Sequence, residues 1–172
     1  MISKPSTFLG MTDQKRVTVH ISDMKASKNP DSFLITHSLG SCIGLVGYDP
    51  LVKAGALLHF QLPDSTDHSR RAKENPFMFA DTGIPMLLQT IFSMGADKRR
   101  LKFSMFGGAN MLDDHELFKI GIKNARATKK ILWQHSFSLL HEDVGGGSSR
   151  TISLEIGSGN IGLRKDGKLY QI

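Results

Sequence analysis

Two short apolar segments separated by a turn constrain the fold of this chain most strongly. Residues 43–48 and 55–62 have β-like sequences, and the Asp49-Pro50 pair between them favours the start of a turn. Successive side chains of a strand point to opposite faces. The second segment therefore has one apolar stripe, formed by Ala56, Leu58, Phe60 and Leu62. The pattern predicts an antiparallel hairpin with one face in the core.

The register of this hairpin decides what lies beside Cys42, the single cysteine of the chain. We expect Tyr48 to pair with Gly55. That register places Gly44 opposite His59 and leaves room across from the imidazole. Cys42 and His59 then become diagonal neighbours on one face, with Cβ atoms about 7–8 Å apart or less. A slip by one residue would put the two side chains on opposite faces.

A lone cysteine forms neither an internal disulfide nor a thiolate zinc cage, which leaves inert burial or reactivity. Gly40 and Ser41 precede the thiol, and a Gly-Ser turn can direct backbone N–H groups toward one point, as an oxyanion hole requires. A cysteine that a histidine can reach is the minimal set for thiolate chemistry. Cys42 and His59 are therefore candidate catalytic residues, and Gly40 and Ser41 are candidates for holding an oxyanion.

Many short segments, in one order from about residue 30 to 170, resemble the bacterial chemotaxis family CheD, the chemoreceptor glutamine deamidases. The core of the resemblance is the run from Thr36 to Cys42. It continues through Tyr48-Asp49-Pro50, Gly55, residues 59–63, Ala80-Asp81, residues 106–111, Ile120-Gly121, Asn124, Glu142-Asp143, Gly145-Gly146 and Arg150. The chain departs from the usual family pattern at His37-Ser38 and in the loop 145–150. The first departure lies beside the predicted site and bears on pocket shape and substrate choice.

The resemblance implies hydrolysis of glutamine side-chain amides in chemoreceptors by a Cys-His-Thr triad. By position, these roles fall on Cys42, His59 and Thr36. His59 would take the thiol proton, and Thr36 would accept a hydrogen bond from the other ring nitrogen. A thiolate–imidazolium pair of this kind predicts a thiol pKa below the free value of about 8.5. We expect neither a metal nor an organic cofactor.

Two other functions remain open at this stage. The domain could serve as a partner of a CheC-type chemotaxis phosphatase, with catalysis secondary. The same thiolate could instead hydrolyse a glutamyl methyl ester, because amide and ester hydrolysis pass through one kind of tetrahedral intermediate. The residues alone do not separate these alternatives.

The 172 residues predict one domain, 1–172, with a loose leader over residues 1–16. No apolar run approaches membrane-spanning length and no secretory signal is evident, so we expect a cytoplasmic protein that is not membrane-embedded. The formal net charge is +6. Basic patches of this kind can serve nucleic acids, but no reader motif is present, so we do not expect nucleic acid as a partner. A basic enzyme would be steered toward the acidic helical bundles that the resemblance implies for chemoreceptors.

The predicted fold class is α/β, with a mixed, largely antiparallel β-sheet or β-sandwich flanked by helices. Further strands are expected at 17–21, 33–36, 101–106, 137–142, 151–156 and 160–171. Helices are expected from about 84 to 94, ended by Gly95, and over 121–135. Residues 63–79 are expected to form a long loop, and Asp166-Gly167 a hairpin turn. The acidic run 113–116 is interpreted as a solvated turn rather than a metal site.

Overall fold

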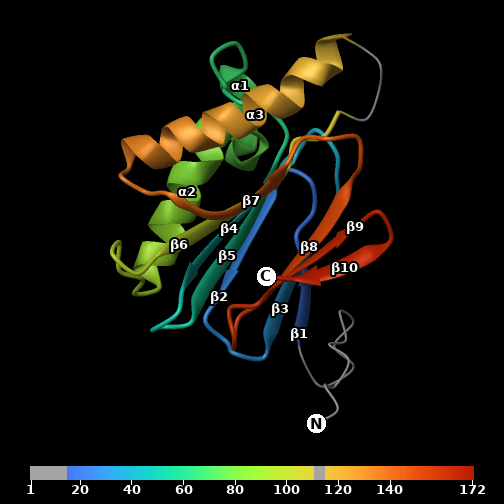
Figure 1. Ribbon diagram of the computed structural model, residues 1–172. Coiled ribbons are helices and arrows are strands. Elements are labelled where there is room, and N and C mark those ends of the chain that lie inside the picture. Colours follow the sequence, from blue (N-terminus) through green and yellow to red (C-terminus); the bar gives the residue numbers. More distant parts are fainter. Residues whose placement is uncertain (1–14, 111–114) are drawn as a thin grey trace.

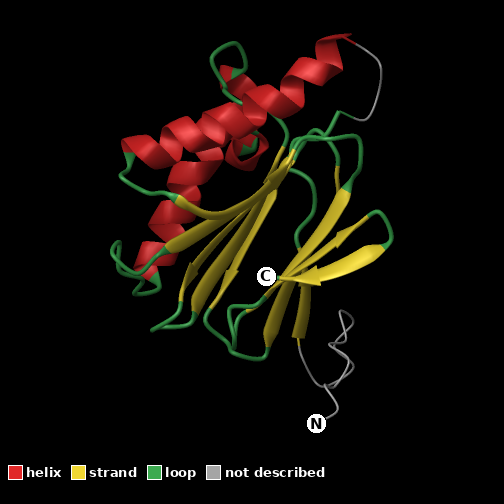
Figure 2. Cartoon of the chain, in the orientation of Figure 1, coloured by secondary structure: helices red, strands yellow, loops and turns green. Residues whose placement is uncertain are grey.

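Two five-stranded β-sheets pack face to face, and helices cover the outer face of one of them (Figures 1 and 2). The computed structural model describes residues 15–110 and 115–172. Sheet A has the strand order β1-β3-β8-β9-β10 and sheet B the order β2-β5-β4-β6-β7. In the described part of the chain, β1 pairs with β3 and β6 with β7 in parallel, and the other strand pairs are antiparallel. The predicted α/β class, with mixed and largely antiparallel sheets, is confirmed.

The strands and helices have the following bounds. Sheet A consists of β1 (Lys15–Thr18), β3 (Ser32–Leu39), β8 (Arg150–Glu155), β9 (Ile161–Lys165) and β10 (Lys168–Gln171). Sheet B consists of β2 (Asp23–Ser27), β4 (Ile43–Asp49), β5 (Ala54–Phe60), β6 (Lys102–Gly107) and β7 (Leu139–Val144). The helices are α1 (Ser69–Glu74), the 3₁₀ turn η1 (Pro76–Met78), α2 (Ala80–Ser93) and α3 (His115–Gln134). No helix in the described ranges is both long and apolar enough to cross a membrane.

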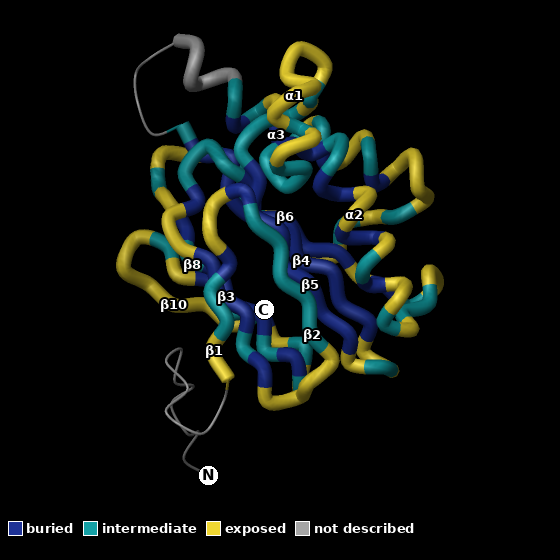
Figure 3. Tube along the Cα trace, turned by 180° about the vertical axis from the view of Figure 1, so that it is seen from behind, coloured by how far each residue is buried: buried dark blue, intermediate teal, exposed yellow. Residues whose placement is uncertain are grey.

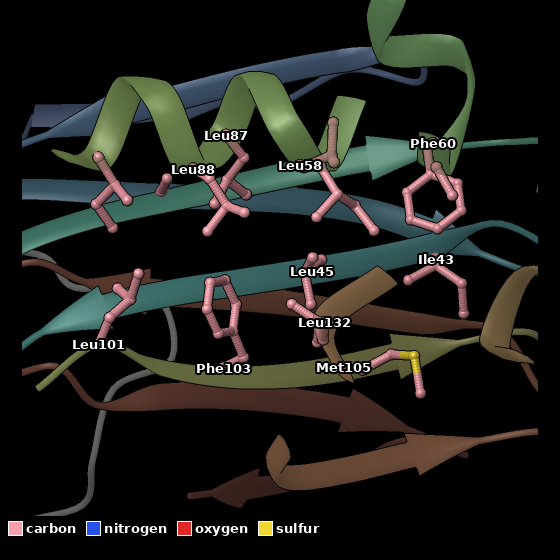
Figure 4. Close-up of a cluster of buried hydrophobic side chains, with 14 of the residues drawn as sticks. Ile43, Leu45, Leu58, Phe60, Leu87, Leu88, Leu101, Phe103, Met105 and Leu132 are labelled. Atoms are coloured by element: carbon pink, nitrogen blue, oxygen red, sulfur yellow. The ribbon is translucent and has the colours of Figure 1, made fainter. Parts of the chain in front are cut away.

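Two apolar clusters hold the three layers together. Alternate residues of the central strands of sheet B face the helices, where Leu45, Leu58 and Phe103 meet Leu87 of α2 and Leu132 of α3 (Figure 4). The other face of sheet B meets sheet A in a second cluster, formed by Leu34, Leu39, Val46, Leu57, Phe106, Ile152 and Leu154 among others. The strands β4 and β5 are therefore buried along their whole length (Figure 3).

Turn chemistry accounts for several element ends. Gly95 has a φ of +93° just after α2, a conformation that glycine adopts without a Cβ penalty. Asp166 and Gly167 both have positive φ, +52° and +72°, as a two-residue type I′ hairpin turn requires. Both sequence predictions are confirmed. The second of these turns joins β9 to β10, which pair antiparallel.

Other sequence predictions were wrong or incomplete. Lys15 and Arg16 pair with β3, so the predicted leader 1–16 is wrong at its end, and residues 1–14 lie outside the described residues. Strand β2 was not predicted, although its five residues alternate between polar and apolar and Met24 and Ala26 pack against the cluster under the helices. The segment 63–79 is not only a loop, since it contains α1 and η1. The acidic run 113–116 cannot be assessed as a site, because 113–114 lie outside the described residues.

Candidate active site

The hairpin formed by β4 and β5 positions the candidate base. Its register pairs Tyr48 with Gly55 and Gly44 with His59, as the sequence predicted. Along β5, Leu57 belongs to the cluster between the sheets, whereas Leu58 belongs to the cluster under the helices. His59, two residues beyond Leu57, therefore faces sheet A. Strand parity thus aims the imidazole into the space between the two sheets.

The space across from the imidazole is not left open as predicted. A Cβ built on Gly44 would come within 2.8 Å of side-chain atoms of both Leu39 and Ile152. Two side chains of sheet A therefore fill the position that a side chain at Gly44 would occupy. Gly44 serves sheet-to-sheet packing, and the absent side chain brings sheet A close to β4 at the level of His59.

Thr36 of β3 fixes the orientation and tautomer of His59. The hydroxyl of Thr36 donates to the backbone carbonyl of Val19, with an O···O distance of 2.7 Å. The same oxygen lies 2.8 Å from His59 Nδ1. Because the single hydroxyl proton is committed to Val19, the oxygen accepts at this contact and Nδ1 carries the ring proton. The lone pair of His59 is therefore on Nε2.

His59 Nε2 is buried and has no hydrogen-bond partner among the described residues. The His59 residue is only 3% exposed. Burial lowers the pKa of His59 to about 4, against a smaller opposing effect of Asp23, its neighbour on β2. The imidazole is thus neutral at neutral pH and keeps a free basic nitrogen. Buried polar atoms are normally paired, so the unpaired Nε2 leaves a basic nitrogen available at this position.

Cys42 immediately precedes β4, and β4 pairs with β5, the strand that carries His59. Burial raises the pKa of Cys42 to about 11, although the backbone N–H of Cys42 itself, which contacts the sulfur, acts in the opposite direction. The predicted low thiol pKa is therefore wrong for the free protein. The cause is desolvation of both groups without a hydrogen bond from the thiol to Nε2. Thiol and imidazole are both neutral in this resting state.

The loop that carries Cys42 is held by its carbonyl groups. The carbonyl of Gly40 accepts from Ala109 N at 2.8 Å, and that of Cys42 accepts from Gly108 N at 2.8 Å. The carbonyl of Ser41 accepts from the side-chain amide of Asn124 at 2.9 Å. In a trans peptide the N–H points opposite to the C=O. The N–H groups of Ser41 and Cys42 therefore point away from the loop 107–109 and from α3.

Glycines make this close packing of loops possible. Gly107 has a φ of +111°, and a Cβ there would overlap the carbonyl oxygen of Cys42. The glycine-rich segment after β7 supports the same loop from its other side. Gly145 N donates to Gly107 O, and Asn110 N donates to Gly146 O. The loop 145–150 thus lies beside the loop 107–110, which contacts the Cys42 loop.

Two further features surround the site. Arg150 is 1% exposed and pairs with Asp143, which also binds Lys165. His37-Ser38, the departure from the usual family pattern, is a bulge in β3, where Ser38 has a φ of +56° and the register with β8 shifts. The bulge directly follows Thr36 and leaves the His37 side chain exposed beside Arg16. Bulges re-aim side chains in this way next to active sites.

The structure thus brings Thr36 and His59 into contact and places Cys42, Ser41 and Gly40 on one clamped loop. Sequence reasoning assigned no role to Asn124, and it had no signal for the carbonyl of Val19, because backbone acceptors leave no residue pattern. In the described ranges, no group of three or more His, Cys, Asp or Glu side chains is arranged to hold a metal ion.

The buried His59 predicts a specific acid sensitivity. Its pKa of about 4 lies below the ordinary 6.5, so the unfolded chain binds the proton more tightly between these values. The stability that the neutral ring contributes is complete above pH 6.5 and is lost as the pH falls toward 4, by about 3 kcal/mol. Urea unfolding of wild type and His59→Gln from pH 7.5 to 4 measures it. The wild type should lose about 3 kcal/mol more than the variant, whereas exposed His135→Gln should follow the wild type. Equal losses in all three proteins would contradict the assignment.

The neutral thiol predicts slow alkylation at neutral pH. Because the thiolate is the reacting species, the rate of iodoacetamide alkylation at Cys42 should rise about tenfold per pH unit from 7 to 9. It should still be rising at pH 10, because the pKa is about 11. His59→Ala should leave the shape of this profile unchanged, since no ion pair holds the thiolate in the free protein. A plateau below pH 7 that disappears in His59→Ala would instead reveal a thiolate–imidazolium pair.

Comparison with known proteins gives a consistent result. The sequence profile of CheD, described as CheD chemotactic sensory transduction, matches residues 61–165. A protein of Solibacter usitatus named "Probable chemoreceptor glutamine deamidase CheD" is 47% identical over 158 residues, which cover 92% of this chain and 94% of the relative. A relative of the same name from Pyrococcus horikoshii is 38% identical over 161 residues, or 91% of this chain and 98% of the relative.

A third relative, "Probable chemoreceptor glutamine deamidase CheD 1" of Syntrophus aciditrophicus, is 44% identical over 151 residues, or 88% of this chain and 94% of its own length. Each of these similarities extends over nearly the full length of both proteins. The profile match and the relatives agree with the motif resemblance, and the chain belongs to the CheD family.

Proposed function

We propose that this protein deamidates glutamine side chains of chemoreceptors, with Cys42 as nucleophile, His59 as base and Thr36 as the residue that orients the base. The observation that carries the proposal is the buried, unpartnered Nε2 of His59, whose tautomer is set by Thr36. A neutral imidazole with a free Nε2 is the state that a general base needs. The names of the relatives supply the substrate class.

The first half of the reaction forms a thioester. Cys42 Sγ attacks the carbonyl carbon of the glutamine amide while the thiol proton passes to His59 Nε2. Because both groups are neutral at rest, this transfer accompanies the attack and does not precede it. The N–H groups of Ser41 and Cys42, which point away from the clamped side of the loop, are proposed to hold the oxyanion. The imidazolium then gives its proton to the departing ammonia.

The second half regenerates the enzyme. His59 Nε2 takes a proton from water as the water attacks the thioester carbonyl, and the sulfur leaves as Cys42 recovers its proton. The product is a glutamate side chain, so each cycle adds one negative charge to the substrate. Thr36 keeps Nδ1 protonated throughout, which holds Nε2 available. A hydroxyl orients the ring but stabilises the imidazolium less than a carboxylate would.

A methylesterase would use the same groups, so mass spectrometry must separate the two reactions. A receptor cytoplasmic fragment incubated with the wild type should gain about 1 Da per deamidated glutamine, whereas ester hydrolysis would remove a methyl group. Cys42→Ala should abolish the gain. His59→Ala should lower the rate by at least 10²–10⁴-fold, because it removes the base. Thr36→Val, which keeps the side-chain shape, should cost less.

Tyr48→Phe is the control for these variants. It removes a hydrogen bond to the carbonyl of Ile156 at the other end of β4, and the rate should stay within about twofold of wild type. Deamidation by Cys42→Ala would refute the role of Cys42 as nucleophile. If the receptor fragment lost only methyl groups, the protein would be a methylesterase and not a deamidase.

We also propose, on the family resemblance, that a CheC-type phosphatase binds this protein and that the reaction takes place in the cytoplasm on the receptor's cytoplasmic domain. If the phosphatase uses a surface separate from the site, His59→Ala should remove deamidation and leave binding within a few-fold. Pull-down and deamidation assays on the same preparation measure both. Competitive inhibition of the wild type by the phosphatase would mean instead that the partner covers the Cys42 loop.

A further inference from the structure

We propose that Asn124 is a positioning residue that sets the placement of the nucleophile relative to the base. Asn124 is fully buried on α3, and its Nδ2 lies 2.9 Å from the carbonyl oxygen of Ser41 and 2.8 Å from that of Gln61. Ser41 directly precedes the nucleophile, and Gln61 comes two residues after His59. This inference rests on the function proposed above, because it assigns Asn124 a part in the same reaction.

The orientation of the Asn124 amide follows from its partners. An amide nitrogen carries two protons, and two carbonyl oxygens lie within hydrogen-bond distance of it. The flipped amide would set its oxygen against both carbonyls, which is repulsive. The two protons of the Asn124 amide nitrogen are therefore both used, one for the carbonyl of Ser41 and one for the carbonyl of Gln61. The amide fixes the spacing of two segments that are twenty residues apart in sequence.

The approach of α3 to the site depends on Gly121, one helical turn before Asn124. A Cβ at Gly121 would lie 2.5 Å from the carbonyl oxygen of Gly108 and 3.1 Å from that of Ala109. Residues three apart share a helix face. Gly121 therefore lets the helix backbone approach the loop 107–109 closely. At this separation a side chain as short as that of Asn124 reaches the carbonyls of both Ser41 and Gln61.

Asn124 differs from the other clamps of the Cys42 loop in being a side chain. The carbonyls of Gly40 and Cys42 are held by backbone N–H groups, which substitution leaves in place. None of the described contacts links Asn124 directly to Cys42 or His59, so its effect passes through main-chain position. A displacement of about 1 Å between reacting groups can cost about 10²-fold in rate.

The test is a double-mutant cycle between Asn124 and His59, read as kcat and KM for deamidation of the receptor fragment. Asn124→Asp keeps the shape and removes both donors, and Asn124→Ala avoids burying a charge. Either variant should lower kcat at least tenfold and leave KM within about threefold. In the Asn124→Ala background, the cost of adding His59→Ala should be at least tenfold smaller than in the wild-type background, because a misplaced base contributes less. Tyr48→Phe, which also removes a donor to a buried carbonyl, should leave the full His59→Ala penalty intact.

Each other outcome overturns the proposal. An undiminished His59→Ala penalty in the Asn124→Ala background would mean that Asn124 does not position the base. An Asn124→Ala protein that fails to fold where Tyr48→Phe folds would assign Asn124 a structural role alone. The proposed function is tested separately by Cys42→Ala. If Cys42→Ala is inactive but the effects of Asn124→Ala and His59→Ala are additive, Cys42 remains the proposed nucleophile and the positioning role of Asn124 is refuted.

Discussion

The hydrogen bond between Thr36 and His59 joins the two sheets at the point where the site forms. Thr36 belongs to sheet A and His59 to sheet B, and the 2.8 Å contact between them lies in the interior of the sandwich. The Thr36 proton is directed to Val19, so the polarity of the contact has one solution. Two features of the site follow from this contact: the tautomer of His59 and the position of its free Nε2.

Burial determines the protonation states of Cys42 and His59. Desolvation disfavours the thiolate and the imidazolium alike, so the free protein holds two neutral groups. If a substrate carbonyl reaches the Cys42 loop, its oxygen can take up the negative charge that burial disfavours on the sulfur. The apparent conflict between a raised thiol pKa and a nucleophilic role is resolved if charge develops on the substrate oxygen during the attack.

The sequence was sufficient where side-chain alternation and turn chemistry decide the outcome. The parity of β5 placed His59 opposite Gly44, and two adjacent residues with positive φ were recognisable in Asp166-Gly167. It was insufficient where a contact depends on the third dimension. Strand β2 is a sheet edge of only five residues, and its alternation of polar and apolar side chains is too short to distinguish a strand from a polar connection. The role of Asn124 depends on a helix that approaches two distant carbonyls, and the thiol pKa depends on burial that composition does not report.

The contributions of two separate sheets to one site have a consequence for how the protein matures. Each sheet can acquire its hydrogen bonds without the other, yet His59 obtains its tautomer only when β3 packs against β5. The orientation of His59 is therefore a property of the docked sandwich and not of either half, and under the proposed mechanism so is catalytic competence. During folding, secondary structure would form before any chemistry, and the first turnover would mark the docking of the sheets. A folding intermediate with undocked sheets would be inactive in deamidation, whatever its helix and strand content.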